Sequence, residues 1–302
     1  KYLKVVSELY SSIRYKRRSE KYVLLVFENI IERNNLIEIN ENEIIASGEI
    51  LSTGLFYYLL MEMGKAGVLL SAMEFMRINS DREPDYYYIL KNLKRNLKLN
   101  SNEKFIYVTQ GFICRNYYGQ VDNLGRGGSD YTAAIIGKAL NCDEVQIWTD
   151  IDGLHNNDPR YVDNTTPIRN ISFNEAAELA YFGAKILHPA TIYPCITSNI
   201  PVVLKNTLNP SDKGTRISKE YLPSGIKAIA AKDDIIVIKI KSLRMLMAYG
   251  FLNKVFEIFS KYKTSIDIIT TSEVSVSLTI DNNNMLNEII NENVKSVEKE
   301  GD

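Results

Sequence analysis

The chain has 302 residues, of which 45% are hydrophobic and 24% are charged, as in folded globular proteins. This length allows two domains, and the net charge of −1 favours neither nucleic acid nor an anionic membrane as a partner. No apolar run approaches the roughly 18 residues of a membrane span, and the first residues lack the apolar stretch of a signal peptide. The three cysteines have no metal-ligand spacing and predict a reducing, cytoplasmic location.

Along residues 1–222, short β-rich runs alternate with helical patterns, which predicts a large α/β domain with a mostly parallel sheet. Near the start, a basic run at 14–18 precedes an apolar run at 22–27, and periodicity does not decide whether the apolar run is helix or strand. The clearest predicted strands are 105–109, 145–149 and 201–204, and the clearest predicted helices are 130–139 and 173–180.

A second, smaller domain is predicted after the Leu-Pro-Ser-Gly linker at 222–225. It covers 226–302 and has the order strand, helix, strand, strand, helix. The predicted elements are strand 234–240, helix 251–262, strands 266–270 and 274–280, and helix 285–292. The alternation of these elements predicts a small α+β fold.

The most informative motif is Leu-Gly-Arg-Gly-Gly-Ser-Asp-Tyr-Thr-Ala-Ala at 124–134, directly before an apolar helical run. Gly127 and Gly128 allow backbone N–H groups to approach an anion, and Ser129 is a predicted N-cap. The positive end of the following helix points at the same place. Arg126 adds a guanidinium suited to a carboxylate or phosphate, so the motif predicts an anion-binding loop.

This loop resembles the substrate loop of aspartokinases, members of the amino-acid kinase family. Further blocks match in the family's order, and the resemblance is dense from residue 44 to 218. The matching blocks are Val-Thr-Gln-Gly-Phe-Ile at 108–113, Trp-Thr-Asp-Ile-Asp-Gly at 148–153 with Asp-Pro-Arg at 158–160, Glu-Leu-Ala-Tyr-Phe-Gly-Ala-Lys-Ile-Leu-His-Pro at 178–189, and Asn-Thr at 206–207 with Gly-Thr at 214–215.

The resemblance implies a three-layer α/β/α sandwich that transfers the γ-phosphoryl group of ATP to the side-chain carboxylate of L-aspartate. The product is 4-phospho-L-aspartate, the first intermediate of lysine, threonine and methionine biosynthesis. ATP acts with Mg²⁺ as a cosubstrate, and no tightly bound cofactor and no metal site formed by protein side chains are expected. Catalysis of this transfer depends on alignment of the two anions and neutralisation of their charge.

The resemblance also assigns the substrate site. Glu49, in a Ser-Gly-Glu block expected to open a helix, resembles the glutamate that holds the substrate α-ammonium, and Arg126 resembles the arginine that clamps a carboxylate. Gly127, Gly128 and Ser129 complete the substrate site, with Arg126 and Asp130 as the catalytic pair. Asp130 is expected to orient the loop, because the attacking carboxylate is already ionised at pH 7 and needs no base.

The nucleotide site is expected at the carboxyl end of strand 145–149, where open α/β sheets bind ligands. Asp150 is assigned to the ribose or adenine edge, Arg160 to a phosphate and Lys185 to the phosphoryl groups. His155 replaces an aromatic residue that most relatives have, and its ring can still stack on adenine. The full predicted set is Thr149, Asp150, His155, Asp158, Arg160, Lys185 and Ile186. An alternative interpretation of 158–160 is a β-turn with a surface salt bridge.

The tail resembles an ACT module, a small regulatory fold that binds amino acids at interfaces. Its pattern matches lysine-sensitive aspartokinases and predicts L-lysine as effector at the interface of a homodimer or a dimer of dimers. The residues assigned to this effector site are Met245, Gly250, Phe251, Ile266, Asp267, Ser272 and Glu273. The alternative is that the apolar residues of this set form core and the acids are solvated.

Two other functions stay open. One is a different enzyme of the amino-acid kinase family. The other is a non-catalytic amino-acid sensor, because the family's Lys-containing Gly-Gly-Thr-Ser loop is not found in this sequence. Dinucleotide enzymes and P-loop nucleotidases are disfavoured, since neither glycine motif is present.

Overall fold

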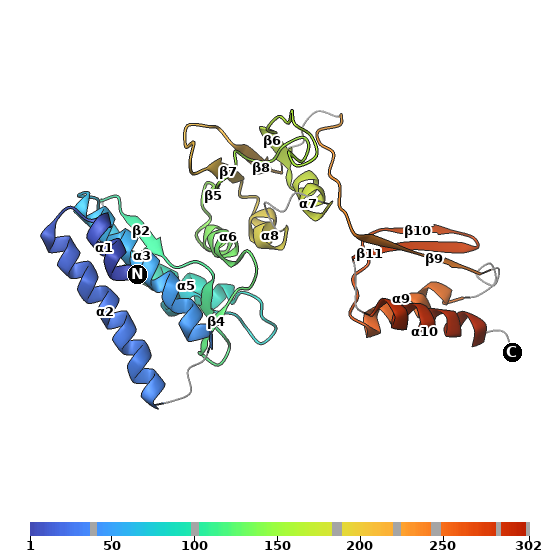
Figure 1. The fold of residues 1–302 in the computed structure, drawn as a ribbon, viewed down its shortest axis with the longest axis horizontal. Coiled ribbons are helices and arrows are strands. Elements are labelled where there is room, and N and C mark those ends of the chain that lie inside the picture. Colours follow the sequence, from blue (N-terminus) through green and yellow to red (C-terminus); the bar gives the residue numbers. More distant parts are fainter. Residues whose placement is uncertain are drawn as a thin grey trace. The chain divides into compact units, whose positions relative to one another are not determined.

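The computed structural model describes residues 1–36, 41–97, 103–182, 189–219, 225–242, 249–281 and 285–299. The chain divides into two compact units, Lys1–Ala230 and Ala231–Asp302. Figure 1 draws both units.

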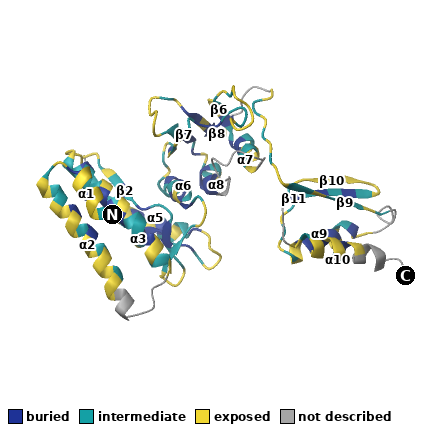
Figure 2. Ribbon diagram, in the orientation of Figure 1, coloured by how far each residue is buried: buried dark blue, intermediate teal, exposed yellow. Residues whose placement is uncertain are grey.

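Unit 1 begins with three helices, α1 (Tyr2–Leu9), α2 (Ile13–Leu36) and α3 (Glu41–Glu62). The run at 22–27 is therefore helical. These helices share a small core of Val6, Tyr10, Val23, Leu51 and Leu55. Much of the outer side of α2 is exposed (Figure 2), which leaves the basic residues of its first turns in solvent.

Helix α3 corrects the expectation that no segment is long and apolar enough for a membrane. An 18-residue window of α3 has a mean hydropathy of 1.4. Length and composition are weak evidence for a span, because helices of folded domains pass the same test. Helix α3 packs against α2, β1, β2 and β4 and carries Glu49 near its middle. Helix α3 is therefore a packed helix of unit 1.

The first sheet of unit 1 is the parallel pair β1 (Gly67–Leu70) and β2 (Ile106–Thr109). Two helices lie between these strands in the chain, α4 (Ala72–Phe75) and α5 (Tyr86–Asn96). The antiparallel hairpin of β3 (Ile113–Arg115) and β4 (Val121–Asn123) follows and leads into α6 (Gly128–Leu140). The predicted strand 105–109 and helix 130–139 are thus confirmed.

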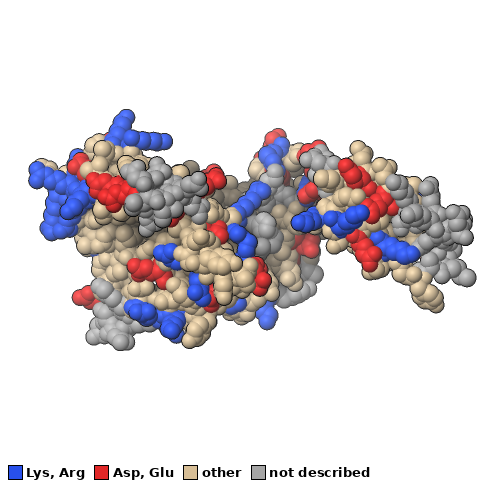
Figure 3. Space-filling model, turned by 90° about the horizontal axis from the view of Figure 1, so that it is seen from below, with Lys and Arg blue, Asp and Glu red and all other residues tan. Residues whose placement is uncertain are grey.

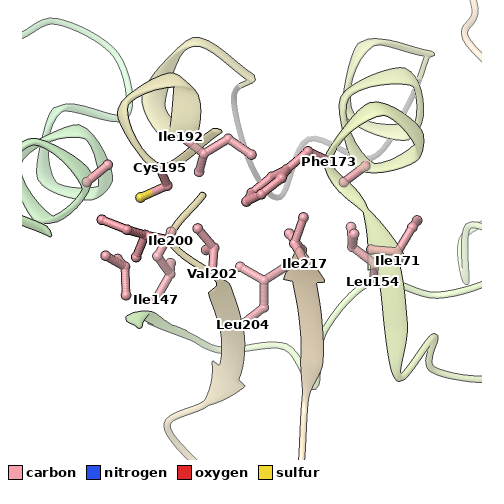
Figure 4. Close-up of a cluster of buried hydrophobic side chains, with 13 residues drawn as sticks. Ile147, Leu154, Ile171, Phe173, Ile192, Cys195, Ile200, Val202, Leu204 and Ile217 are labelled. Atoms are coloured by element: carbon pink, nitrogen blue, oxygen red, sulfur yellow. The ribbon is translucent and has the colours of Figure 1, made fainter. Parts of the chain in front are cut away.

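The second sheet has the order β5-β7-β8-β6. Its strands are β5 (Val145–Thr149), β6 (Asn170–Ser172), β7 (Val202–Asn206) and β8 (Thr215–Ser218). Pairs β5–β7 and β6–β8 are parallel, and β7–β8 is antiparallel. Helices α7 (Phe173–Phe182) and α8 (Pro189–Ser198) contribute to a core with side chains from all four strands (Figure 4).

Unit 2 has the predicted strand-helix-strand-strand-helix order. Its elements are β9 (Ile235–Lys241), α9 (Phe251–Lys261), β10 (Ile269–Ser272), β11 (Ser275–Asp281) and α10 (Leu286–Lys299). The strands form an antiparallel sheet in the order β10-β11-β9. The core includes Val255, Ile258 and Phe259 of α9.

Charged side chains of both signs are interspersed on the face shown in Figure 3. This distribution agrees with the net charge of −1.

Candidate active site

The glycine loop leads into α6 through left-handed backbone. Gly125 and Gly127 have φ of +72° and +69°, a region that suits glycine. Gly127 is the N-cap, and the helix starts at Gly128. The prediction of Ser129 as N-cap is therefore wrong, because Ser129 already lies in the first turn. Gly128 N donates to Gly125 O at 3.1 Å, which joins the loop to the first turn of α6.

Glycine is also required at two places by close packing. A Cβ on Gly128 would lie 2.7 Å from Cδ2 and 3.1 Å from Cα of Phe112. A Cβ on Gly111 would lie 2.9 Å from Oγ of Ser129. The backbone at 111–112 therefore packs directly on the start of α6, so the loop and the turn after β2 form one wall.

A shallow pocket of about 330 Å³ opens at this wall. Three segments that are distant in sequence meet there: α3, the turn after β2, and the loop with the start of α6. The lining residues are Glu49, Phe112, Gly125, Gly127, Gly128, Ser129 and Asp130. Four of the residues predicted for the substrate site thus come together with Asp130 of the predicted catalytic pair.

Glu49 lies in the middle of α3, so the block at 47–49 does not open a helix as expected. Helix α3 begins at Glu41, because the apolar residues before Glu49 continue the helical pattern. The Glu49 side chain is half-buried and reaches the pocket from one side. Its carboxylate suits an ammonium group at a place where the α6 N-terminus suits an anion.

Asp130 is half-buried in the first turn of α6, and burial raises the pKa of its carboxyl group. No described residue donates a hydrogen bond to this carboxylate. Arg126 is exposed in the turn before α6 and is not part of the pocket wall. The two residues predicted as catalytic thus differ in position: Asp130 lines the pocket and Arg126 stands beside it.

Phe112 lines the pocket but is not among the site residues predicted from the sequence. Its φ of +69° is unusual for a bulky side chain and marks a strained position. Its N–H donates to Oγ1 of Thr132 at 3.0 Å, and its carbonyl accepts from Leu124 N at 2.8 Å. The block at 108–113 indicated that this segment belongs to the site, but no local pattern predicts a positive φ at a phenylalanine.

The predicted nucleotide residues Thr149 and Asp150 stand at the carboxyl end of β5, as expected. Thr149 Oγ1 donates to Asp150 Oδ1 at 3.0 Å. The loop that follows is held by buried Thr215, whose hydroxyl donates to Ile168 O at 2.6 Å and accepts from Leu154 N at 2.9 Å. The Gly-Thr block at 214–215 therefore acts by fixing this loop.

His155 and Arg160 both have partners within the loop. The ring of His155 bonds to Asp152 Oδ1 at 2.7 Å and to Thr165 Oγ1 at 2.8 Å. Arg160 Nε lies 3.0 Å from both carboxylate oxygens of Asp158. These hydrogen bonds lower the pKa of the Asp158 carboxyl. The contacts fit the salt-bridged turn. The guanidinium has five N–H donors, so Arg160 can contact a phosphate while it stays paired with Asp158.

Lys185, Ile186 and Met245 lie outside the described residues. In unit 2, Phe251 is buried in the core, and Ile266 packs against it. Gly250 has a φ of +83° and caps α9, and Ser272 Oγ lies 2.7 Å from Ser275 Oγ.

The two predicted effector acids have different surroundings. The Asp267 side chain is 5% exposed, with Oδ2 3.7 Å from Lys232 Nζ. Glu273 is exposed in the turn between β10 and β11. An ammonium ligand of Asp267 therefore has to compete with Lys232.

Metal binding by protein groups alone has no support in the described part of the chain, where no three His, Cys, Asp or Glu side chains gather. Cys114, Cys142 and Cys195 are free thiols. Burial raises the pKa of Cys114 to about 12, which keeps this thiol protonated and inert.

Comparison with known proteins identifies the family. Residues 6–206 match the model of the amino acid kinase family. The chain belongs to this family. The predicted fold class agrees with solved structures of the family. The T-state structure of Escherichia coli aspartokinase III with lysine and aspartate has a TM-score of 0.70 at 34% identity, covering 93% of this chain and 66% of that one. For Clostridium acetobutylicum aspartate kinase the TM-score is 0.78 at 30% identity, covering 91% and 62%.

Two curated relatives are similar in sequence to most of this chain. Lysine-sensitive aspartokinase 3 of Escherichia coli is 41% identical over 245 residues, which cover 80% of this chain and 54% of that protein. Chloroplastic aspartokinase 3 of Arabidopsis thaliana is 40% identical over 248 residues, which cover 79% and 44%. The chain thus spans about half the length of the curated relatives it matches.

Proposed function

We propose that the protein is an aspartate kinase that transfers the γ-phosphoryl group of ATP to the side-chain carboxylate of L-aspartate. The observation that carries the proposal is the pocket in which Glu49 faces the glycine loop at the start of α6. A carboxylate opposite a helix N-terminus matches a small zwitterion. The relatives named aspartokinase support the same substrate.

In this proposal each side of the pocket binds one end of the substrate. Glu49 holds the α-ammonium, and Arg126 binds a carboxylate together with the N–H groups of Gly127, Gly128 and Ser129. The Gly128 N–H gives up its bond to Gly125 O when it binds the substrate. Asp130 takes no proton from the attacking group, because that carboxylate is ionised at neutral pH. Its carboxylate instead orients the loop.

ATP is assigned to the carboxyl end of β5, near Thr149 and Asp150, with His155, Asp158, Arg160, Lys185 and Ile186 as further contacts. A structure of Escherichia coli aspartokinase III with aspartate and ADP supports the cosubstrate. We assign Mg²⁺ to the phosphates of ATP and to water, since Mg²⁺ keeps several waters and is commonly bound through substrate phosphates. The free thiols support a cytoplasmic location.

The test is a measurement of ADP release with L-aspartate, L-glutamate and no amino acid, with hydroxylamine present to trap an acyl phosphate. We expect ADP and the aspartyl hydroxamate with L-aspartate only. Equal turnover of L-glutamate contradicts the substrate assignment and favours another member of the family. Calorimetric binding of L-aspartate without ADP release favours the amino-acid sensor.

We further propose that 226–302 is an ACT-like regulatory domain beside a catalytic domain at 1–222, and that L-lysine inhibits a homodimer through it. The element order of unit 2 supports this, as does the relative described as lysine-sensitive. Asp267, Ser272 and Glu273 are the polar groups assigned to the effector, with Met245, Gly250, Phe251 and Ile266 around them.

Titration with L-lysine and L-threonine, followed by thermal stability and kinase rate, tests the regulatory proposal. Stabilisation and inhibition by lysine that are lost in Glu273→Ala support it. Glu257→Ala is the matched control, since Glu257 is on α9 and pairs with Asn253. A response to threonine alone, or to neither amino acid, overturns it.

A further inference from the structure

We propose that Gln110 and Thr53 fix the rotation of α3 about its axis and thereby direct the Glu49 carboxylate into the pocket. The inference rests on the proposed function, because it concerns how that same pocket is held in shape. Neither side chain lines the substrate pocket. Both are therefore positioning residues.

The geometry consists of a short chain of three hydrogen bonds, one buried and two partly buried. The Gln110 side chain follows β2 and is 3% exposed. Its Oε1 accepts from Ala72 N at 2.8 Å, and its Nε2 donates to Thr53 Oγ1 at 2.8 Å. The Thr53 hydroxyl donates in turn to the carbonyl of Glu49 at 2.7 Å. One amide thus joins the end of β2, the start of α4 and the turn of α3 that carries Glu49.

Hydrophobic packing alone does not select the rotation of α3. Apolar residues occur around the whole helix: Ala46, Leu51, Leu55 and Leu60 are buried, whereas Ile44, Ile45 and Phe56 are exposed. Successive helical residues are about 100° apart, so a shift of one position exchanges one apolar face for another and removes Glu49 from the pocket. A buried hydrogen bond is directional and costly to leave unmade, so it distinguishes these rotations.

A second contact on α3 has a different consequence. The Tyr22 hydroxyl donates to Ile50 O at 2.9 Å, and its ring occupies the space that a Cβ on Gly54 would need. This contact fixes α3 against α2. The bond from Gln110 fixes α3 against the segment that continues into Gly111 and Phe112, which is the opposite wall of the pocket. A further bond, from Asn123 Nδ2 to Asn42 Oδ1 at 2.9 Å, joins the first turn of α3 to the segment before the glycine loop. The Gln110 bond joins the turn that carries Glu49 to the wall at 111–112.

The experiment compares two hydroxyl deletions on the same helix. Thr53→Val removes the acceptor for Gln110 with little change in shape. Ser52→Ala is the matched control, because the exposed Ser52 hydroxyl also donates to Glu49 O, at 3.1 Å, without a bond to Gln110. Thr53→Ser restores the hydroxyl. Binding of L-aspartate is measured by calorimetry, and KM is measured for both substrates.

We expect Thr53→Val to raise the Kd and KM for L-aspartate about tenfold or more, since displacements of about 1 Å have effects up to about 100-fold. KM for ATP is expected to change less than about twofold, because a rotation of α3 leaves β5 untouched. Ser52→Ala and Thr53→Ser are expected to stay within about twofold of the unmodified protein. A merely structural role for Thr53 predicts no such split between the two substrates.

Unchanged aspartate affinity in folded Thr53→Val, or an equal rise for ATP, overturns the inference. If Thr53→Val fails to fold, Gln110→Met decides. Methionine has a similar length but no N–H group to donate to Thr53 Oγ1, so the same aspartate-specific rise is expected, and wild-type affinity in the folded variant overturns the inference. Failure of the unmodified protein to bind aspartate instead contradicts the proposed function.

Discussion

Arg126 is the residue whose removal tests the substrate assignment most directly. Its guanidinium is exposed beside the pocket, where it can close on a bound carboxylate. Arg126→Ala removes a charge-assisted bidentate contact of about 2–4 kcal/mol. We therefore expect kcat/KM for L-aspartate to fall about 30- to 1,000-fold. Steady-state kinetics with varied aspartate check this. Arg216→Ala is the control, because Arg216 pairs with Glu144 on the surface, at 3.1 Å; normal kinetics in Arg126→Ala contradict the assignment.

At the same scale, Lys185 is expected to act on the nucleotide side alone. Lys185→Ala removes one positive charge near the phosphates, so it weakens ATP binding more than aspartate binding. Calorimetric titration of both ligands measures the difference. Unchanged ATP affinity assigns Lys185 a structural role instead.

At the scale of elements, substitution of two helical glycines by alanine is expected to change the free energy of unfolding in opposite directions. The sequence alone does not distinguish these two glycines. Gly128→Ala places a Cβ 2.7 Å from the Phe112 ring, so we expect a loss of about 1–3 kcal/mol in the free energy of unfolding. Gly48→Ala lies within α3 with no described atom within 4 Å of its Cβ, so we expect a gain of about 0.5–1 kcal/mol. Urea unfolding of both variants is the measurement, and stabilisation by Gly128→Ala contradicts the close packing.

Elements with strong local patterns were predictable, and their tertiary contacts were not. The β5 strand and helix α9 have clear periodicity, and the structure places them where the sequence indicates. The predicted N-cap of α6 was wrong, because the left-handed backbone at Gly127 lets the helix begin at Gly128, before Ser129. The bonds from Phe112 N to Thr132 and from Gln110 to Thr53 join residues 20 and 57 positions apart, and no local pattern encodes such pairs.

At the scale of the whole molecule, the segment that connects the two units has defined contacts on each side. In unit 1, Lys227 Nζ lies 2.6 Å from Glu175 Oε1, and Ile229 N donates to Asn156 O at 2.9 Å. In unit 2, Lys232 Nζ lies 2.5 Å from Asp281 Oδ1, which raises the pKa of Lys232. The connecting segment is therefore bonded to unit 1 up to Ile229 and to unit 2 from Lys232 onward.

The attachment on unit 1 predicts a pH dependence. Ser172 and Glu175 form a capping box at the start of α7, with Ser172 N donating to Glu175 Oε2 at 2.9 Å. The hydrogen bond from Lys227, and next that from Ser172, lowers the pKa of Glu175 to about 2. A folded pKa below the unfolded value of about 4.3 stabilises the fold above that value, and the contribution disappears as the pH falls toward 2.

Lys227→Met removes the larger of these two causes and brings the pKa of Glu175 back toward its ordinary value. We therefore expect the free energy of unfolding of the variant to fall less steeply between pH 4.5 and 2 than that of the unmodified protein. The difference between the two proteins is expected to be largest at neutral pH, where Glu175 is ionised in both states. Lys65→Met, which removes an exposed ammonium, is the control and is expected to leave the slope unchanged. Urea unfolding at a series of pH values measures the slope, and equal slopes in Lys227→Met and the unmodified protein show that the pair does not contribute to stability, as holds for many exposed ion pairs.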